Sequence, residues 1–310
     1  MKIYLTDISE SWIIDRIKRE WILNNKKITT KFSFMSDIIW DIAPWSTNPS
    51  FIRKNHTKKI VKSVYHIEDP SPDSKEIGRI IENDKYVDAY HVISKKTEKE
   101  LNSISKKPTF HLPLWVNQAI WYPIHNKIDL RNKYDFSNED YLVGSFQRDT
   151  EGSDLISPKL IKGPDIFIEI IKDMYNKNNN LKVLLTGKRR GFVINELTKN
   201  NIPYRYFEMP NFSVMNELYN ILDLYLITSR LEGGPQALVE CGQTKTPVIS
   251  TDVGIAKQIL AKESIFDYKN ITTFDQATPN IEVAFAESSK LSIPNGMLGY
   301  IDMFNEVYES

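Results

Sequence analysis

The second half of the chain alternates short apolar runs with longer segments whose apolar residues recur every three or four positions. The short runs predict strands, and the periodic segments between them predict helices. The predicted strands cover residues 141–146, 181–187, 204–209, 222–229 and 247–251. The predicted helices cover residues 163–178, 191–201, 214–221 and 235–244. Strands that alternate with helices in this way indicate a parallel sheet with helices on both faces.

The first half shows the same alternation in a less regular form. Strand-like runs cover residues 2–5, 60–67, 90–93 and 109–116, and an amphipathic helix is predicted over residues 11–25. Ser94 precedes a charged segment and is a suitable N-cap for a further helix. The first half is therefore predicted to form an α/β unit of its own.

The fold class that follows is α/β, with two doubly wound Rossmann-like domains that face each other across a cleft. A chain of 310 residues is long enough for two such domains. We expect residues 1–128 to form the N-terminal domain and residues 129–310 the C-terminal domain, and the last helix to pack back on the N-terminal domain. In open α/β sheets, ligands bind outside the carboxyl ends of the strands, so the cleft is the expected site.

The charge of the chain is balanced overall, but its two halves differ. The 40 Lys and Arg equal the 40 Asp and Glu, which argues against a general nucleic-acid-binding protein. Residues 1–128 nevertheless carry 21 basic and 15 acidic side chains. This surplus either faces an anionic partner or is the ordinary charge of a protein surface.

The cysteine content and hydropathy of the chain indicate its compartment. The single cysteine, Cys241, excludes an internal disulfide and favours a reducing environment. Its apolar, helix-like surroundings indicate a core residue rather than a nucleophile. No apolar run reaches the about eighteen residues of a membrane-spanning helix, and the N-terminal residues lack a signal-peptide core. We therefore expect a cytoplasmic protein that is either soluble or peripheral at the cytoplasmic face of the membrane.

The strongest candidate for a binding site is the turn "SRLEGGPQALVE", residues 229–240. Gly233 and Gly234 let the backbone approach a ligand closely, and Pro235 suits the first turn of the helix that follows. Unpaired N–H groups at a helix N-terminus favour phosphate. Glu232 precedes the turn, and Glu240 lies where its carboxylate can accept hydrogen bonds from vicinal hydroxyls such as those of a ribose. The alternative is an ordinary strand-to-helix turn with two solvated acids.

The same stretch resembles the C-terminal signature of retaining GT-B glycosyltransferases of family 4, the glycosyl transferases group 1. The matching elements are Glu232, "GGPQALV", Glu240 and "CGQTKTPVISTDVGIAKQIL". Weaker similarity extends over residues 141–262, and it fades in the first half.

The resemblance implies that the C-terminal domain holds a nucleotide-sugar donor and that the N-terminal domain holds the acceptor. It implies that Glu240 binds the ribose hydroxyls and that Glu232 contacts the donor sugar. It also implies a turn whose amides meet the sugar and the diphosphate, formed by Gly233, Gly234, Pro235, Gln236, Ala237 and Leu238. The acceptor is then a glycan, a lipid-linked glycan or another polysaccharide precursor.

Cations must stabilise the diphosphate that leaves in such a transfer. The resemblance assigns this role to Lys162 and Arg148, and it places Lys188 near the nucleotide. Arg148 departs from the family pattern, because it lies four positions after Gly144 instead of one. With these cations, no metal ion or other cofactor is expected, and the sequence has no Asp-x-Asp motif or ligand-spaced Cys/His cluster.

The first half contributes candidates for the acceptor side. His66 follows a predicted strand, where family members often have a histidine near the donor sugar and the acceptor; a structural histidine is the alternative. Residues 9–11 stand where the family often has a glycine-rich loop. Trp40, Trp45 and Trp115 are either sugar-stacking or core residues. Residues 51–62, "FIRKNHTKKIVK", either contact an anionic membrane or form a solvated loop.

We therefore predict a metal-independent retaining glycosyltransferase that moves a sugar from a nucleotide-diphosphate donor to a hydroxyl acceptor. One alternative keeps the fold but makes the protein a sugar phosphorylase or a nucleotide-sugar epimerase. Another alternative is a degenerate, non-catalytic GT-B subunit that acts as a binding or scaffold partner. The displaced Arg148 favours this last alternative, and the pair Glu232 and Glu240 opposes it.

Overall fold

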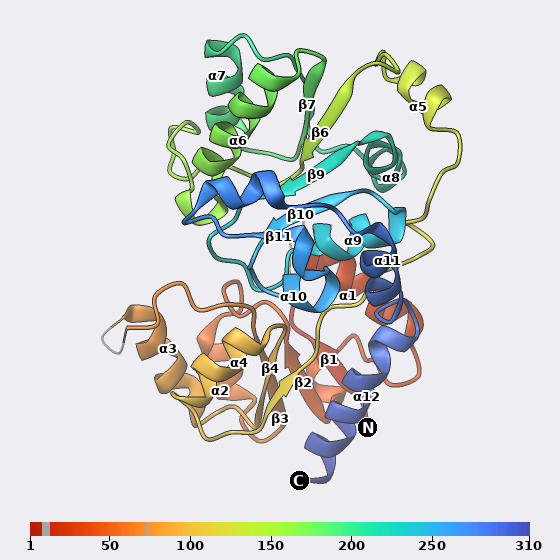
Figure 1. Ribbon diagram of the computed structural model, residues 1–310. Helices are drawn as coiled ribbons and strands as arrows, with labels where there is room; N and C mark the ends of the chain where they lie inside the picture. Colours follow the sequence, from red (N-terminus) through yellow and green to blue (C-terminus); the bar gives the residue numbers. More distant parts are fainter. Residues whose placement is uncertain (8–12, 72–73) are drawn as a thin grey trace. The chain divides into compact units, whose positions relative to one another are not determined.

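The computed structural model describes residues 1–7, 13–71 and 74–310, and the chain forms two compact units (Figure 1). Unit 1 comprises Met1–Trp115 and Leu291–Ser310, and unit 2 comprises Val116–Lys290. The C-terminal segment thus belongs to the unit that the N-terminal segment forms.

Unit 1 is built on a parallel sheet whose strands follow in the order β1-β2-β3-β4-β5. The strands are β1 (Ile3–Leu5), β2 (Ile38–Asp41), β3 (Lys59–Val64), β4 (Ala89–Val92) and β5 (Thr109–His111). A bridge between Ile3 and Thr29 continues the sheet beyond β1. The helices are α1 (Ile13–Asn24), α2 (Pro49–Lys54), α3 (Lys75–Asp84), α4 (Lys95–Asn102) and α12 (Asn295–Glu309).

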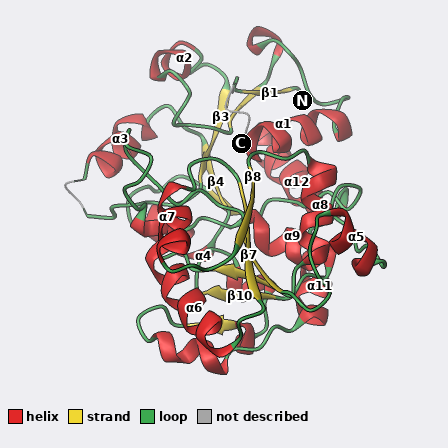
Figure 2. Ribbon diagram, turned by 90° about the horizontal axis from the view of Figure 1, so that it is seen from above, coloured by secondary structure: helices red, strands yellow, loops and turns green. Residues whose placement is uncertain are grey.

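The two faces of this sheet bury separate hydrophobic clusters. On one face, Trp40 and its neighbours pack against α1 and α12. On the other face, Ile60 and its neighbours pack against α2, α3 and α4. Figures 1 and 2 show these two sets of helices on opposite sides of the strands. The strands β1, β2 and β4 are buried along their whole length, as expected of a parallel sheet covered on both faces.

Of the three tryptophans that were either sugar-stacking or core residues, two lie in the core of unit 1. Trp40 and Trp115 are fully buried, and both pack near Trp21 of α1 and Tyr300 of α12. These two residues are therefore core residues. Trp45 differs, because 57% of it is exposed, in the loop after β2.

Unit 2 has a parallel sheet in the order β11-β10-β9-β6-β7-β8. Its strands are β6 (Tyr141–Ser145), β7 (Leu181–Thr186), β8 (Tyr204–Phe207), β9 (Leu224–Ile227), β10 (Val248–Thr251) and β11 (Ile265–Phe266). Its helices are α5 (Lys127–Lys133), α6 (Pro164–Lys177), α7 (Gly191–Lys199), α8 (Phe212–Ile221), α9 (Gln236–Thr244), α10 (Ala256–Ile259) and α11 (Ile281–Ser289). The predicted strands and helices of this half agree with the structure to within a few residues at their ends.

The strand order of unit 2 places a topological switch point between β6 and β9. From β6 the chain moves outward through β7 to β8, and it then returns on the other side of β6 with β9, β10 and β11. The loops that follow β6 and β9 therefore diverge from neighbouring strand ends. Ligands of doubly wound sheets bind at such a point.

The boundary between the units differs from the predicted one at residues 128/129. The chain changes unit at Trp115/Val116, because the segment that follows is bonded to α8. The N–H of Tyr122 donates to Asn216 Oδ1 over 3.1 Å, and the N–H of Ile124 donates to Asn220 Oδ1 over 2.7 Å. These side-chain contacts leave no periodic signal in the sequence.

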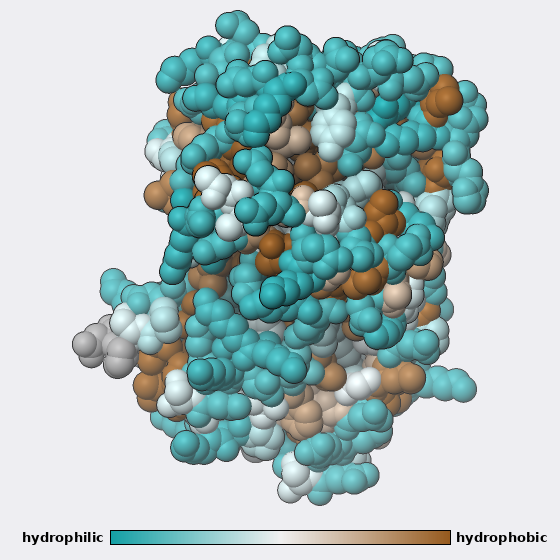
Figure 3. Space-filling model, in the orientation of Figure 1, coloured by the Kyte–Doolittle hydropathy of each residue, from teal (hydrophilic) through white to brown (hydrophobic). Residues whose placement is uncertain are grey.

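One face of the protein can be judged for its polarity in Figure 3. The face shown in Figure 3 is mostly hydrophilic, and its hydrophobic residues form small, separate patches. Among the described residues, no helix has the length and hydropathy needed to cross a membrane.

His91 of β4 yields a prediction for the pH dependence of stability. It is fully buried, its Nδ1 lies 2.9 Å from Ser63 Oγ, and its Nε2 lies 2.8 Å from the Leu112 carbonyl oxygen. Burial lowers the pKa of His91 from 6.5 to about 4. The unfolded chain therefore binds the proton first as the pH falls, and the free energy of unfolding decreases between about pH 6.5 and about pH 4.

We expect this one residue to remove about 2 kcal/mol of stability between about pH 7.5 and about pH 5. Urea unfolding of the wild type and of His91→Gln, followed by tryptophan fluorescence at both pH values, measures the effect. The variant should lose less stability than the wild type on acidification. An equal loss in both proteins would contradict the assignment.

Candidate functional site

The glycine turn predicted from the sequence joins β9 to α9 at the switch point of unit 2. The helix begins at Gln236, one residue later than predicted, and Pro235 is its N-cap. In the part of the chain that the structure describes, no side chain caps α9. The first N–H groups of a helix have no partner inside the helix, and they carry the positive end of its dipole. The start of α9 therefore carries the partial positive charge that attracts an anion.

A second glycine turn supports the first one from the neighbouring strand. Gly254 follows β10 and has a positive φ of 57°. A Cβ atom at this position would lie 2.6 Å from the carbonyl oxygen of Gly233 and 3.0 Å from Gly234 Cα. The two turns therefore pack backbone against backbone, and Gly254 does not tolerate a side chain at the point of contact.

The loop that follows β6 is bonded to the loop that follows β9. The N–H groups of Arg230 and Leu231 donate to the Ile161 carbonyl oxygen over 2.8 and 3.1 Å. The hydroxyl of Thr228 donates to the carbonyl oxygen of Gly163 over 2.8 Å. These bonds fix the short 3-10 turn Leu160–Lys162 beside the turn that precedes α9.

Lys162 and Glu232, which were predicted to act on the same donor, form an ion pair with each other. Lys162 Nζ lies 2.5 Å from Glu232 Oε1, and the two side chains are 21% and 13% exposed. Ser229 Oγ donates to the same carboxylate over 3.0 Å. Gln147 Nε2 donates to the Lys162 carbonyl oxygen over 3.0 Å. The pair is thus held in place from both loops.

Ser229 and Gln147 were not predicted, although both flank residues that were. Ser229 Oγ lies 3.3 Å from Gln147 Oε1, so the two side chains connect the end of β9 to the segment after β6. Arg230 adds a two-pronged ion pair with Asp165 of α6, with N···O distances of 2.7 and 2.6 Å. A polar residue directly after a strand was the available signal for Ser229.

Arg148 and Lys188 have no such anchors. Arg148 is half-buried and Lys188 is exposed, and neither side chain has a hydrogen bond or ion pair within the described residues. Both cations are therefore available to a ligand. Arg190, two positions after Lys188, is fully buried instead, and its Nε lies 2.9 Å from Asp149 Oδ2.

Glu240 lies inside the unit rather than on a polar helix face. It is 5% exposed, and its Oε2 accepts a hydrogen bond of 2.9 Å from the hydroxyl of Tyr219 of α8. Burial, together with the neighbouring Glu240, raises the pKa of Tyr219 well above its ordinary value. Tyr219 therefore keeps its proton and orients the carboxylate. The interpretation of Glu240 as a solvated surface acid is wrong.

The other residues of the turn divide into backbone and side-chain roles. Leu238 is fully buried and Gln236 is 6% exposed, so Leu238 can offer only its main chain to a ligand. Ala237 is half-buried beside them.

Cys241 is buried as predicted, and burial raises the pKa of its thiol well above the ordinary value. A thiol of this kind suits a core residue and not a nucleophile.

His66 belongs to unit 1, where it follows β3 by two residues. It is half-buried, and its Nε2 lies 3.7 Å from Glu68 Oε1. Trp45, also at the carboxyl edge of this sheet, packs edge-on against Tyr65 with ring centroids 5.6 Å apart. Residues 9–11, predicted to replace a glycine-rich loop, lie outside the described residues.

The described residues contain no group of three or more His, Cys, Asp or Glu placed to hold a metal ion. The acids of the site are engaged instead with cations and hydroxyl groups, as Glu232 and Glu240 show.

The fold of the chain is that of GT-B glycosyltransferases. The Anabaena protein HepE, in complex with UDP, superposes with a TM-score of 0.77 at 11% identity, over 99% of this chain and 100% of that one. Sucrose-phosphate synthase from Thermosynechococcus elongatus gives a TM-score of 0.72 at 13% identity, over 98% and 81% of the two chains. A point mutant of TarM from S. aureus gives 0.65 at 16% identity, over 95% and 58%.

The sequence comparison agrees with the fold. Residues 157–278 match the model of the family described as glycosyl transferases group 1. This range contains Lys162, Glu232 and Glu240, so the resemblance to this group is confirmed where it was strongest. The comparison with curated proteins gave no match.

The contact between the two loops can be tested at Gly163. Its φ is 63°, and a Cβ atom there would lie 1.8 Å from the carbonyl oxygen of Thr228. We expect Gly163→Ala to destabilise unit 2 by at least about 2 kcal/mol, because left-handed strain and a backbone clash add together. Thermal unfolding measures the change.

Gly78→Ala is the matched control for this substitution. Gly78 is exposed in α3, and nothing lies within 4 Å of the position that its Cβ would take. Alanine should leave the free energy of unfolding unchanged or raise it by up to about 1 kcal/mol, so the melting temperature should not fall. Equal melting temperatures for Gly163→Ala and the wild type would show that the loops are not held as described.

Proposed function

We propose that this protein is a retaining glycosyltransferase that moves a sugar from a nucleotide-diphosphate donor to an acceptor hydroxyl. The observation that carries the proposal is the uncapped start of α9 at the switch point, beside the paired Lys162 and Glu232. Helix N-termini bind phosphate through amides and dipole. A carboxylate at the same place suits the hydroxyls of a sugar.

The diphosphate of the donor is proposed to lie against the start of α9. Lys162 gives up part of its contact with Glu232 and turns to the phosphate oxygens, while Arg148 and Lys188 supply further positive charge. Glu232 is then released to accept hydrogen bonds from the donor sugar. The ion pair keeps both side chains ordered near the site until a donor replaces it.

Glu240 is proposed to bind the ribose hydroxyls of the nucleotide. Its hydrogen bond from Tyr219 orients the carboxylate, and burial strengthens each hydrogen bond that it makes. UDP is the proposed nucleotide, because HepE and TarM, which have a similar fold, were solved with UDP.

The transfer itself breaks the bond between the sugar C1 and the diphosphate oxygen and forms a bond from C1 to the acceptor oxygen. The acceptor proton passes to the leaving diphosphate, and both oxygens use the same face of the sugar, so the configuration is retained. The developing negative charge falls next to Lys162, Arg148 and the α9 dipole, which makes a metal ion unnecessary. His66 is proposed to lie near the acceptor, a glycan or lipid-linked glycan in the cytoplasm.

A non-catalytic GT-B subunit is the second candidate function. The four-position spacing between Gly144 and Arg148 favours it. Calorimetry separates the candidates, because a scaffold without a donor site should bind none of UDP, GDP, ADP or CMP.

Removal of the Lys162 ammonium should slow the chemical step and leave the protein folded. We expect Lys162→Ala to reduce kcat by about 100-fold, as loss of a preorganised group at a charged transition state does. Release of UDP from a UDP-sugar with a glycan acceptor measures the rate. Lys172→Ala, at an exposed position of α6, is the matched control and should be fully active. Equal rates in the two variants would contradict the role of Lys162.

Loss of the Glu240 charge should weaken the binding of the nucleotide. We expect Glu240→Gln, which preserves shape, to raise the Kd for UDP by about tenfold, since hydrogen bonds to a charged group contribute about 1.5–3 kcal/mol. Titration calorimetry with UDP measures this change, and circular dichroism checks the fold. An unchanged Kd would remove Glu240 from the donor site.

A further inference from the structure

Unit 1 exposes three neighbouring apolar side chains at the amino-terminal edge of its sheet. Phe32, Phe34 and Met35 are 54%, 76% and 58% exposed. Phe32 and Phe34 stack on each other with ring centroids 5.5 Å apart. We call these three residues the apolar tip. Single exposed apolar residues are common, but a contiguous group indicates an interaction surface.

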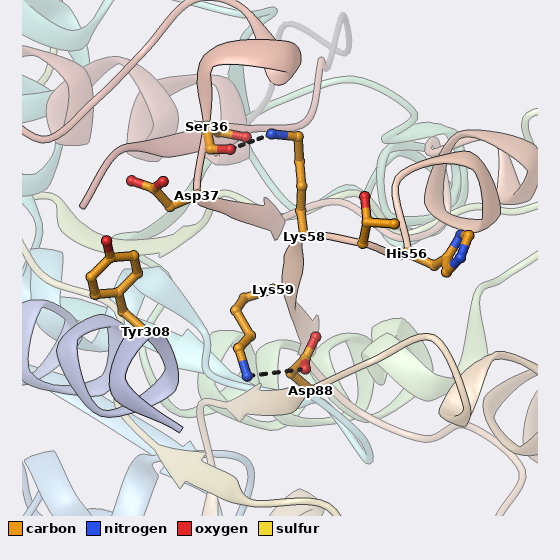
Figure 4. Close-up of a pocket in the computed structure, with 8 residues that line it drawn as sticks. Ser36, Asp37, His56, Lys58, Lys59, Asp88 and Tyr308 are labelled. Carbon is orange, nitrogen blue, oxygen red and sulfur yellow. Dashed lines mark hydrogen bonds and ion pairs between the residues drawn. The ribbon is translucent and has the colours of Figure 1, made fainter.

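The backbone of the apolar tip is held in place by hydrogen bonds. The N–H of Met35 donates to the Phe32 carbonyl oxygen over 3.1 Å, and Ser36 Oγ donates to the Ser33 carbonyl oxygen over 2.7 Å. Lys58 Nζ donates to the carbonyl oxygens of Phe34 and Ser36. Figure 4 shows the Lys58 side chain directed toward Ser36. The tip is therefore presented outward by a defined turn.

Two runs of the chain that contain no acidic residue meet at this edge. Residues 21–36 carry Lys26, Lys27 and Lys31, and residues 42–67 carry Arg53, Lys54, Lys58, Lys59 and Lys62. The bonds from Lys58 to Phe34 and Ser36 join the two runs. Lys26, Lys27, Lys31 and Lys54 are exposed, and the Lys2 Nζ donates to the Lys27 carbonyl oxygen over 2.7 Å. Lysines thus lie on both chain segments that meet at the apolar tip.

Three acids near this surface, Asp37, Asp88 and Glu82, are already paired. Asp37 Oδ2 accepts a 2.6 Å hydrogen bond from the Lys2 N–H, and Asp88 lies 3.8 Å from Lys59 Nζ. Both acids line an open hollow of about 480 Å³, together with His56, Lys58 and Tyr308. Arg53 of α2 pairs with Glu82 of α3 over 3.2 Å, and Lys54 is the next exposed cation of α2. Lys26, Lys27 and Lys31 take no part in these pairs.

We propose that this edge of unit 1 docks on an anionic lipid bilayer. The apolar tip enters the interface, where aromatic side chains and methionine gain from burial between headgroups and acyl chains. Lys26, Lys27 and Lys31 meet the anionic headgroups around it. The charge complementarity favours an acidic membrane over a second copy of the chain, because two copies of one basic surface repel each other.

The position of the apolar tip leaves the ligand-binding edge of the sheet free. The tip precedes β2, and the hollow lies where β2, β3 and β4 begin. Ligands of parallel sheets bind at the other edge, where the strands end. The residues 51–62 expected to meet the membrane thus contribute cations, whereas the apolar part comes from residues 32–35. This docking does not depend on the proposed transferase activity.

Vesicle sedimentation tests the proposal with the full chain. We expect the wild type to sediment with vesicles of phosphatidylcholine mixed with phosphatidylglycerol, less so at high salt, and not with phosphatidylcholine alone. Phe32→Ser with Phe34→Ser should weaken binding by about tenfold or more. Ile128→Ser replaces another exposed apolar residue, 57% exposed in unit 2, and should bind like the wild type. Circular dichroism and the melting temperature verify that each variant folds.

Three results would overturn the proposal. The first is a wild type that does not bind the anionic vesicles, and the second is a double variant that binds them as well as the wild type does. The third is a wild-type dimer in light scattering that the double variant abolishes without any vesicle binding, because the tip would then join two copies. Reversal of charge at Lys26, Lys27 and Lys31 to Glu should also abolish binding, and retention of binding would contradict the electrostatic part.

Discussion

The backbone contact between Gly163 and Thr228 is the constraint on which the site of unit 2 depends. It joins the loop after β6 to the loop after β9, the two loops that diverge at the switch point of the sheet. Only a residue without a Cβ allows this approach, and its left-handed φ also favours glycine. Because the contact is made by main chain, the residues on either side of it are fixed with little freedom. Lys162 and Glu232 come within 2.5 Å of each other as a consequence.

A second backbone contact, between Gly254 and the Gly233–Gly234 turn, holds the start of α9 from the other side. The helix end is therefore positioned by glycine packing and not by a capping side chain. This arrangement holds the positive end of the helix dipole in a fixed position, which is what an anion site requires. The ion pair, the buried Glu240 and the start of α9 are three separate features that meet around one turn, and their combination supports the proposed donor site.

The pattern of unit 2 was readable from the sequence because its strands are long apolar runs separated by strongly periodic helices. Unit 1 was harder: β2 (Ile38–Asp41) was missed, although "DIIWDIA" is an apolar run, since residues 26–37 directly before it show no clear period. Glycine, proline and acid spacing identified Glu232 and Lys162. The spacing could not reveal that the two residues pair, nor that Tyr219 orients Glu240, because those contacts depend on how distant helices pack.

The most direct test of the central claim compares UDP, UMP and uridine by titration calorimetry. If the start of α9 and Lys162 hold a diphosphate, UDP should bind at least about tenfold more tightly than UMP, and uridine should bind most weakly, because the affinity then comes from charge-assisted hydrogen bonds to phosphate. Equal affinities for the three compounds, or no binding of UDP, would contradict the account.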